Sequence, residues 1–338
     1  MADELGGVTL HCGDALEFLR GLPDDSVDLL FTSPPYLEAR TYGIGAGRKL
    51  DDWVAWMTEV VTVAAPKVKG LIAVNCEGQT KNYRYLPAPF LLTADLHRAG
   101  FNLRKPVVFH RIGIPGSGGP DWLRNDWEPV VCVTRAGKMP WSDNTAMGHT
   151  PKWAPGGEMS HRQSNGSRVN QWGHPIASGA TVVDAGGVVT SKGRRPSHVG
   201  MTKKMYSRNP DGSRDEGEHY APPVKANPGN LTKRTYTTDE VAALLAETGN
   251  VQRCEVGGGV MGHDLAHDNE APFPLKLAEF FVLSFCPPGG VVCDPFVGSG
   301  TTAHAAVLHG RRFVGGDLRQ SQIDLTRRRL RGVTPALV

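Results

Sequence analysis

The feature that most constrains the fold is a glycine turn between an apolar run and a helical pattern near the C-terminus. Residues 291–293 (Val-Val-Cys) are predicted to form a buried strand, residues 294–302 (Asp-Pro-Phe-Val-Gly-Ser-Gly-Thr-Thr) the turn, and residues 301–308 a helix. The two glycines let the backbone approach a ligand closely, and the first turn of the helix presents free N–H groups toward an electron-rich ligand. This strand, turn and helix predict one unit of a parallel α/β sheet.

The same turn differs from two other nucleotide-binding loops. No lysine precedes its hydroxyl residues, which excludes the phosphate loop of ATPases, and the third glycine of a nicotinamide-binding fingerprint is missing. Asp294 is placed to hold a cationic amino group of a ligand. Asp317 ends the next predicted strand, where an acid in such folds grips two ribose hydroxyls. A tight turn without a ligand is the alternative interpretation of this segment alone.

Short apolar runs alternate with amphipathic stretches on both sides of a different middle region. Strands are predicted at residues 27–31, 71–74, 106–110, 128–134, 291–293 and 312–315, and helices at 52–64, 88–99, 273–285, 301–308 and 320–330. This alternation predicts an α/β fold with a doubly wound, mostly parallel sheet. A chain of 338 residues with 40% hydrophobic residues is long enough to bury such a core.

Residues 139–269 are rich in Gly, Ser, Asn, Pro, His and Arg, and only residues 238–247 have a helical signature. From Lys138 to Arg234 the chain carries 14 Lys and Arg against 7 Asp and Glu, although its net charge is only +3. Such a basic segment predicts contact with phosphates, and a solvated polar insertion is the alternative. We therefore expect two halves of one α/β domain, residues 1–138 and 270–338, separated by an insertion.

A second motif, Ser33-Pro34-Pro35-Tyr36, directly follows the strand predicted at residues 27–31. An exocyclic amine on cytosine or adenine is a poor nucleophile because its lone pair is delocalised into the ring, so acceptors must grip its N–H groups. Ser33 Oγ and the Pro34 carbonyl can accept these hydrogen bonds from a backbone that Pro35 restricts. Tyr36 can stack on a base swung out of the duplex.

Together the two motifs resemble the amino-methyltransferases of DNA, in particular the group whose catalytic tetrapeptide precedes the cofactor loop in the chain. The resemblance implies S-adenosylmethionine as cofactor, double-stranded DNA as substrate, direct methyl transfer, and target recognition by residues 139–269. Residues 11–14 and 271–278 also resemble family segments, which implies that Asp14 contacts the cofactor adenine and Phe273 its methionine side. The expected catalytic residues are Ser33, Pro34, Pro35 and Tyr36. The expected cofactor-binding residues are Asp14, Phe273, Asp294, Pro295, Phe296, Gly298, Ser299, Gly300, Thr301 and Asp317.

The resemblance also implies which base is modified. Within this family a serine before Pro-Pro-Tyr is associated mainly with N4 of cytosine, and aspartate or asparagine mainly with N6 of adenine, which is the alternative here. Methylation at C5 is disfavoured because it needs a cysteine nucleophile after a proline, whereas Cys286 precedes Pro287. The same chemistry on RNA or a protein amide, and a nucleic-acid-binding protein that has lost catalysis, are the other readings; the basic insertion favours DNA.

The remaining expectations concern partners, metals and location. The predicted DNA contacts are Lys192, Arg194, Arg195, Lys203, Lys204 and Arg208. A companion restriction endonuclease is a further partner that the resemblance admits. No metal site is expected, because the pairs His263-Asp264 and His267-Asp268 lack a third ligand nearby. No apolar run approaches the roughly 18 residues of a membrane span, and residues 1–7 carry acids where a secretory signal carries bases, so we expect a cytoplasmic protein.

Overall fold

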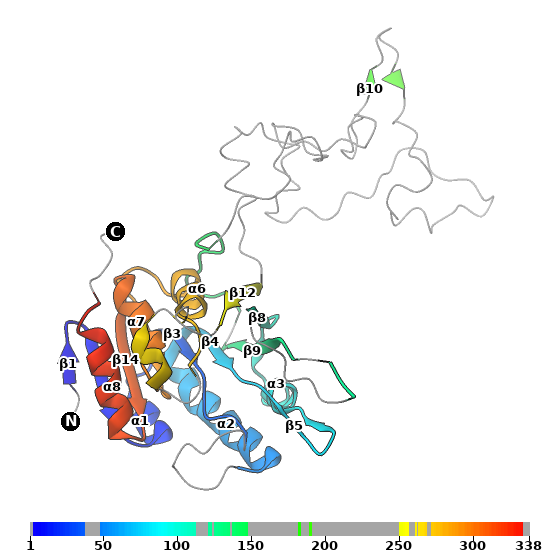
Figure 1. The fold of residues 1–338 in the computed structure, drawn as a ribbon. Helices are drawn as coiled ribbons and strands as arrows, with labels where there is room; N and C mark the ends of the chain where they lie inside the picture. The colour runs from blue at the N-terminus through cyan, green and yellow to red at the C-terminus, as the bar shows by residue number, and fades with distance from the viewer. Residues whose placement is uncertain are drawn as a thin grey trace. The chain divides into compact units, whose positions relative to one another are not determined.

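The computed structural model describes residues 3–37, 48–112, 121–123, 125–135, 137–147, 182–183, 189–190, 250–256, 261, 263–268 and 272–333. The chain divides into two compact units, one of Met1–Met147 with Gly249–Val338 and one of Gly148–Thr248. In the second unit the described residues are the antiparallel strands β10 (Val182–Val183) and β11 (Val189–Thr190). The first unit contains an α/β sheet (Figure 1).

This sheet has ten strands in the order β1-β2-β14-β13-β3-β4-β9-β8-β12, with β7 paired to β9 off this path. The strands are β1 (Asp3–Leu5), β2 (Val8–Cys12), β3 (Val27–Thr32), β4 (Val68–Asn75), β7 (Asn102–Leu103), β8 (Val107–Ile112), β9 (Trp127–Thr134), β12 (Val251–Glu255), β13 (Val291–Asp294) and β14 (Arg312–Asp317). From β2 to β4 all neighbours are parallel, while β1 and β9 join this block antiparallel. The predicted mostly parallel sheet is confirmed.

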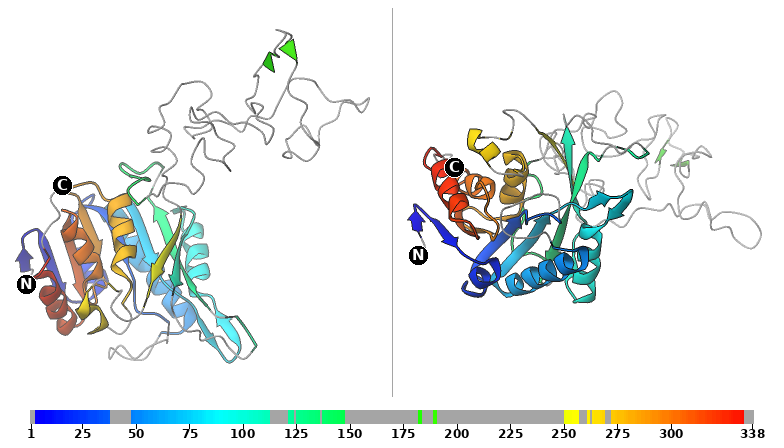
Figure 2. Two further views of the ribbon diagram at one scale, coloured as in Figure 1. Left: turned by 45° about the horizontal axis from the view of Figure 1, so that its top comes forward. Right: turned by 60° about the horizontal axis from the view of Figure 1, so that its bottom comes forward.

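Helices cover both faces of the sheet, as the right-hand view of Figure 2 shows. One face carries α1 (Ala15–Arg20), α2 (Leu50–Ala64) and α3 (Ala88–Arg98), and the other carries α6 (Leu275–Phe285), α7 (Thr301–Leu308) and α8 (Gln320–Leu330). The side chains of β3 alternate between the two cores: Leu29 and Phe31 pack with α6 and α7, whereas Leu30 packs with α2. A strand buried on both faces explains the continuous apolar run in the sequence.

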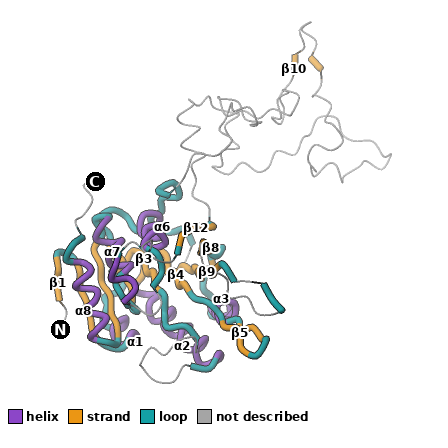
Figure 3. The backbone as a smooth tube through the Cα atoms, in the orientation of Figure 1, coloured by secondary structure: helices purple, strands orange, loops and turns teal. Residues whose placement is uncertain are grey.

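The remaining elements are short. A hairpin of β5 (Gln79–Lys81) and β6 (Arg84–Leu86) follows β4, and 3-10 helices occur at η1 (Ala65–Lys67) and η3 (Asp264–Asp268). The alternation of strands and helices can be followed in Figure 3. Among the described residues, no helix has both the length and the apolar character that crossing a membrane requires.

The helices predicted at residues 301–308 and 320–330 have the same bounds as α7 and α8. Strand β12 was not predicted, and it lies within the expected insertion 139–269 yet pairs with β8 in the central sheet. Its sequence, Val-Gln-Arg-Cys-Glu, contains few apolar residues because it forms an edge of the sheet. The helix predicted at residues 238–247 lies outside the described residues.

Candidate active site

Two segments that are far apart in the sequence meet at one edge of the sheet. We call residues 33–36 the catalytic peptide and residues 294–302 the glycine turn. They follow β3 and β13, which are adjacent parallel strands in the sheet, so both segments leave at the carboxyl edge. Thr32 Oγ1, at the end of β3, donates a hydrogen bond of 2.6 Å to Asp294 Oδ1, across a separation of 262 residues in the chain. The two motifs therefore meet in the structure.

A cavity opens between these two segments. It is lined by Ser33, Pro34 and Pro35 of the catalytic peptide, Pro295, Phe296 and Gly298 of the glycine turn, Gly13, Asp14 and Ala15 after β2, Asp317, Leu318 and Arg319 at the end of β14, and Arg48 and Trp56 from the α2 region. The cavity thus touches the carboxyl ends of four neighbouring strands, the place where open α/β sheets bind ligands. A ligand in it would contact both motifs.

Two carboxylates in the cavity wall are fixed by backbone N–H groups. Asp14 Oδ1 caps α1 by accepting hydrogen bonds from the backbone of Leu16 (2.9 Å) and Glu17 (3.1 Å). Asp317 accepts from the backbone N–H of Gly298 (3.1 Å) through Oδ2 and from that of Arg319 (2.9 Å) through Oδ1. Both acids are held in place before any ligand arrives, and both suit ligand groups that donate hydrogen bonds, such as hydroxyls or an amino group.

The aromatic part of the cavity wall comes from α2 and the glycine turn. The Trp56 ring packs edge-to-face on Phe296 with centroids 5.3 Å apart, and the Arg48 guanidinium lies 4.0 Å from the Trp56 centroid. Flat apolar surfaces of this kind suit a purine ring. Arg48 and Trp56 were not predicted as site residues; a tryptophan in the second turn of a helix that has acids in its first turn was the available signal.

Asp294 lies behind the cavity rather than in its wall. It is 1% exposed, and its carboxylate accepts hydrogen bonds from Thr32 Oγ1 (2.6 Å), the backbone N–H of Phe296 (3.0 Å) and Thr302 Oγ1 (2.8 Å). Burial raises the pKa of Asp294 to about 6, while these three hydrogen bonds act in the opposite direction. The contacts fasten the end of β3 to the glycine turn, a role different from the grip on a ligand amino group that the sequence suggested.

A buried arginine of α8 holds the glycine turn through hydrogen bonds. Arg329, fully buried in α8, donates hydrogen bonds to the Ser299 carbonyl (3.3 Å), Thr301 Oγ1 (2.9 Å) and His304 Nδ1 (3.2 Å). Gly300 has a φ of +76°, and a Cβ there would lie 2.7 Å from Thr326. Ser299, Gly300 and Thr301 therefore shape the turn but do not line the cavity.

Phe273 is also outside the cavity wall, although the family resemblance implied a contact with the cofactor. Its ring packs edge-to-face on Phe31 of β3, with centroids 5.3 Å apart, and it lies against the core between the sheet and α6. Of the expected cofactor-binding residues, the cavity is lined by Asp14, Pro295, Phe296, Gly298 and Asp317.

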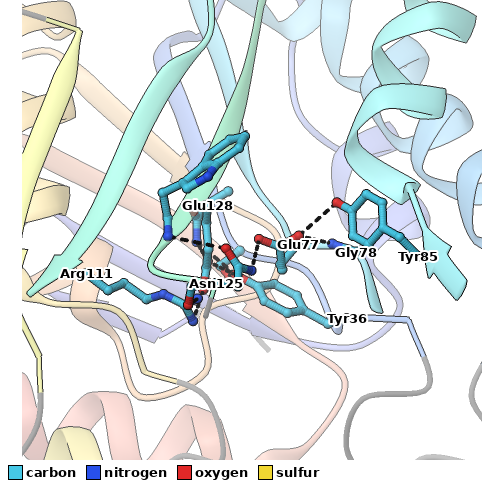
Figure 4. Close-up of polar contacts among 10 residues, drawn as sticks. Tyr36, Glu77, Gly78, Tyr85, Arg111, Asn125 and Glu128 are labelled. Atoms are coloured by element: carbon cyan, nitrogen blue, oxygen red, sulfur yellow. Dashed lines mark hydrogen bonds and ion pairs between the residues drawn. The ribbon is translucent and has the colours of Figure 1, made fainter. Parts of the chain in front are cut away.

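The hydroxyl of Tyr36 lies in a hydrogen-bond network, shown in Figure 4. Ser33 Oγ donates to Tyr36 Oη at 3.3 Å, and Tyr36 Oη donates to Glu128 Oε2 at 2.8 Å. Asn75 Nδ2 donates to Tyr36 Oη (2.9 Å) and to Glu128 Oε2 (3.0 Å), and Arg111 forms an ion pair of 3.0 Å with Glu128 Oε1. Burial raises the pKa of Tyr36 and that of Glu128. The network ties the catalytic peptide to β4, β8 and β9.

The backbone of the catalytic peptide is fixed as well. Trp53 Nε1 of α2 donates a hydrogen bond of 2.8 Å to the Pro35 carbonyl, and Pro34 is buried. Ser33 and Pro34 are thus held by a rigid segment in the cavity wall. Glu128, Asn75 and Arg111 were not predicted as site residues. The signal for Glu128 is a charged residue opening a strand that is otherwise apolar.

Two further expectations concern DNA contacts and metal binding. The predicted DNA contacts Lys192, Arg194, Arg195, Lys203, Lys204 and Arg208 all lie outside the described residues. Over the part of the chain that the structure describes, no group of three or more His, Cys, Asp or Glu side chains is placed to hold a metal ion.

An open α/β sheet with a cavity at its carboxyl edge, walled by fixed acids and a glycine turn, defines a nucleotide-cofactor-binding class of protein. Comparison with known families agrees with this class and narrows it. The family model N6_N4_Mtase, described as DNA methylase, matches residues 27–328. The chain therefore belongs to the N6/N4 family of DNA methyltransferases.

Individual relatives match nearly the whole chain at low identity. The type II methyltransferase M.SfiI from Streptomyces fimbriatus is 23% identical over 373 residues, covering 92% of this chain and 88% of that protein. The DNA adenine methyltransferase YhdJ from Escherichia coli (strain K12) is 22% identical over 326 residues, covering 95% and 82%. The structure of PvuII DNA methyltransferase, described as cytosine-N4-specific, shares the fold with a TM-score of 0.58 at 16% identity, covering 96% of this chain and 86% of that one.

Proposed function

We propose that this DNA methyltransferase transfers a methyl group from S-adenosylmethionine to the exocyclic N4 amine of cytosine in double-stranded DNA. The observation that carries the proposal is the single cavity lined by both the catalytic peptide and the glycine turn. S-adenosylmethionine supplies a sulfonium methyl group when it is bound. The chain's own residues have to hold the cofactor, grip the amine and exclude water from between them.

The residues of the cavity wall fit this cofactor. Asp317, held by the backbone of Gly298 and Arg319, suits the two ribose hydroxyls. Asp14, at the end of β2, suits the adenine amino group, and Trp56 with Phe296 offers an apolar surface to a purine. The buried Asp294 does not line this wall, so its contribution to cofactor binding passes through the position of the turn.

The catalytic peptide would activate the amine by accepting its hydrogens. Ser33 Oγ and the Pro34 carbonyl are the two acceptors, and the hydrogen bond from Trp53 to Pro35 keeps the peptide in place. Acceptors aimed at both N–H groups draw the nitrogen lone pair out of the ring, so that it can attack a methyl carbon. With its hydroxyl tied to Glu128, the Tyr36 ring has a fixed position against which an extruded base can stack.

Cytosine N4 is favoured over adenine N6 by Ser33 at the first position of the catalytic peptide, in line with the family association. Relatives of both kinds match the chain, an adenine enzyme and a structure described as cytosine-N4-specific, so adenine N6 is the second candidate. The motif order, with the catalytic peptide before the glycine turn, supports membership of the permuted group. The complete catalytic peptide argues against an inactive DNA-binding protein.

We assign DNA recognition to residues 139–269, with Lys192, Arg194, Arg195, Lys203, Lys204 and Arg208 as phosphate or base contacts. We also propose a companion restriction endonuclease as a partner, in line with the type II relatives, and the cytoplasm as the place of action.

Incubation of the protein with duplex DNA and methyl-labelled S-adenosylmethionine, followed by digestion to nucleosides, should yield labelled N4-methylcytosine. Labelled N6-methyladenine would instead select the second candidate. The same incubation with Ser33→Ala protein is the control for a contaminating activity. An unlabelled digest from protein that binds the cofactor would contradict the proposal.

A further inference from the structure

We propose that Glu128 is a positioning residue that sets the direction of the hydrogen bonds running from Ser33 through Tyr36, and that it receives the proton which the methylated amine loses. The inference rests on the proposed function, because the amine gripped by Ser33 is the substrate of that function. It adds a role for Glu128, Arg111 and Asn75, whose network lies beside the cavity.

The role follows from a requirement of the chemistry. A serine hydroxyl both donates and accepts hydrogen bonds, but Ser33 has to accept from the amine. Its own hydrogen therefore needs another acceptor, and Tyr36 Oη lies 3.3 Å away. Tyr36 must in turn place its hydrogen elsewhere, and Glu128 Oε2 lies 2.8 Å away. An ionised carboxylate only accepts, so Glu128 fixes the direction of every bond before it.

The surroundings of Glu128 increase the affinity of its carboxylate for a proton, which suits the end of a chain that takes one up. Glu128 is 7% exposed, and burial raises its pKa, but the Arg111 guanidinium 3.0 Å from Oε1 acts in the opposite direction. Asn75 Nδ2 donates to both Tyr36 Oη and Glu128 Oε2, so it does not take the hydrogen of Tyr36, which stays directed at Glu128. A carboxylate that is buried and paired can hold its charge at neutral pH and can still take up a proton.

The same chain of contacts can carry the surplus proton away. When the amine nitrogen forms its new N–C bond, the methyl C–S bond of the sulfonium would break with its electron pair left on sulfur. The nitrogen then carries the positive charge, and one of its N–H protons must leave. That proton passes to Ser33 Oγ as the Ser33 hydrogen moves to Tyr36 Oη and the Tyr36 hydrogen moves to Glu128 Oε2. The electron pair of the broken N–H bond stays on the nitrogen, which becomes neutral, and Glu128 ends as a neutral acid.

A neighbouring carboxylate provides a matched control. Glu77 accepts hydrogen bonds from Tyr85 Oη (3.0 Å) through Oε1 and from Asn125 Nδ2 (3.0 Å) through Oε2, as Figure 4 shows. These contacts hold the β5–β6 hairpin and the approach to β9, and they form a branch separate from the bonds between Ser33, Tyr36 and Glu128. The Glu77→Gln variant therefore removes a charge of the same region without touching the proposed chain of hydrogen bonds.

The test compares single-turnover methylation rates of Tyr36→Phe, Glu128→Gln and the double variant on duplex DNA with saturating S-adenosylmethionine. Each single change should slow the rate by about tenfold, the worth of one hydrogen bond to a charged group, with cofactor and DNA affinities near wild type. The double variant should be no slower than the slower single variant, because both changes break one chain. Glu77→Gln should keep the wild-type rate.

Losses that multiply in the double variant, a wild-type rate for Glu128→Gln, or equal slowing by Glu77→Gln would each overturn the inference. If Glu128→Gln does not fold, the solvent isotope effect on the methylation rate replaces it. The wild-type rate should fall in D2O, and the rate of Tyr36→Phe should not. An equal fall in both proteins would overturn the inference. A wild-type protein that methylates no amine would refute the proposed function instead, so the two failures can be told apart.

Discussion

Replacing Ser33 by alanine should lower the rate of methyl transfer by about 10²- to 10³-fold, the usual cost of losing one preorganised contact to a reacting group. Ser33 lines the cavity, and in the proposed function its Oγ accepts from the amine, whose charge grows as the new bond forms. Cofactor affinity should stay near wild type, because Asp14, Asp317 and Phe296 supply the rest of the wall. Single-turnover kinetics measures the rate, and calorimetry with S-adenosylmethionine measures the affinity.

A matched serine serves as the control for this prediction. Ser26 Oγ, just before β3, donates a hydrogen bond of 2.7 Å to the Pro23 carbonyl, and Ser26 is not part of the cavity wall. Ser26→Ala should keep both the rate and the cofactor affinity of the wild type. Loss of cofactor affinity in Ser33→Ala at an unchanged transfer rate would reverse the roles assigned to the two motifs.

Asp294→Ala should lower the free energy of unfolding by about 2–5 kcal/mol, since it leaves two buried hydroxyls and a partly buried N–H without their acceptor. These donors are Thr32 Oγ1, Thr302 Oγ1 and the backbone N–H of Phe296. Because the carboxylate joins β3 to the glycine turn, cofactor affinity and transfer rate should fall together, unlike in Ser33→Ala. Denaturant unfolding, calorimetry and single-turnover kinetics on one preparation test this. A stable Asp294→Ala variant with the wild-type methyl-transfer rate would show that the hydrogen bonds of Asp294 are dispensable.

The matched variant Asp294→Asn separates charge from hydrogen bonding. Its Oδ1 can still accept from Thr32 and from Phe296 N–H, and its amide can donate to Thr302 Oγ1, which accepts as well as donates. We therefore expect Asp294→Asn to be much more stable than Asp294→Ala at neutral pH.

The pH dependence of stability gives a further check on Asp294. Burial raises its pKa from 3.8 to about 6. The folded protein thus holds a proton that the unfolded chain has released, so this contribution to stability is full below about pH 4 and is lost as the pH rises through about 6. A shift of about two units corresponds to about 3 kcal/mol. The unfolding free energy of Asp294→Asn minus that of wild type should rise by most of this amount between about pH 4 and 7, and a constant difference would contradict it.

The local features of this fold were predictable because their signals lie close together in the sequence. The glycine turn, α7 and α8 follow from neighbouring residues: a strand ending in an acid, two glycines, and regular apolar spacing. The meeting of the catalytic peptide and the glycine turn was also predictable, because parallel strands place their carboxyl ends at one edge.

The burial of individual side chains and the pairing register of distant strands were not predictable. Asp294 was expected to face a ligand, but the sequence does not say that Thr32 and Thr302 would surround its carboxylate. Glu128 meets Asn75 and Tyr36 only because β9 runs antiparallel beside β4, pairing Val130 with Asn75. That register depends on the whole sheet, and no local pattern near Glu128 encodes it. Strand β12 was missed because an edge strand has few apolar residues, so no apolar run marks it in the sequence.

The central claim is that one cavity holds the cofactor and the target amine side by side. A crystal structure of the protein with S-adenosylhomocysteine and duplex DNA containing its site tests this most directly. We predict that the cofactor lies between Asp317 and Ser33, and that an extruded cytosine places its amine within hydrogen-bond distance of Ser33 Oγ and the Pro34 carbonyl. A cofactor bound elsewhere, or a target base that does not reach Ser33, would contradict the account.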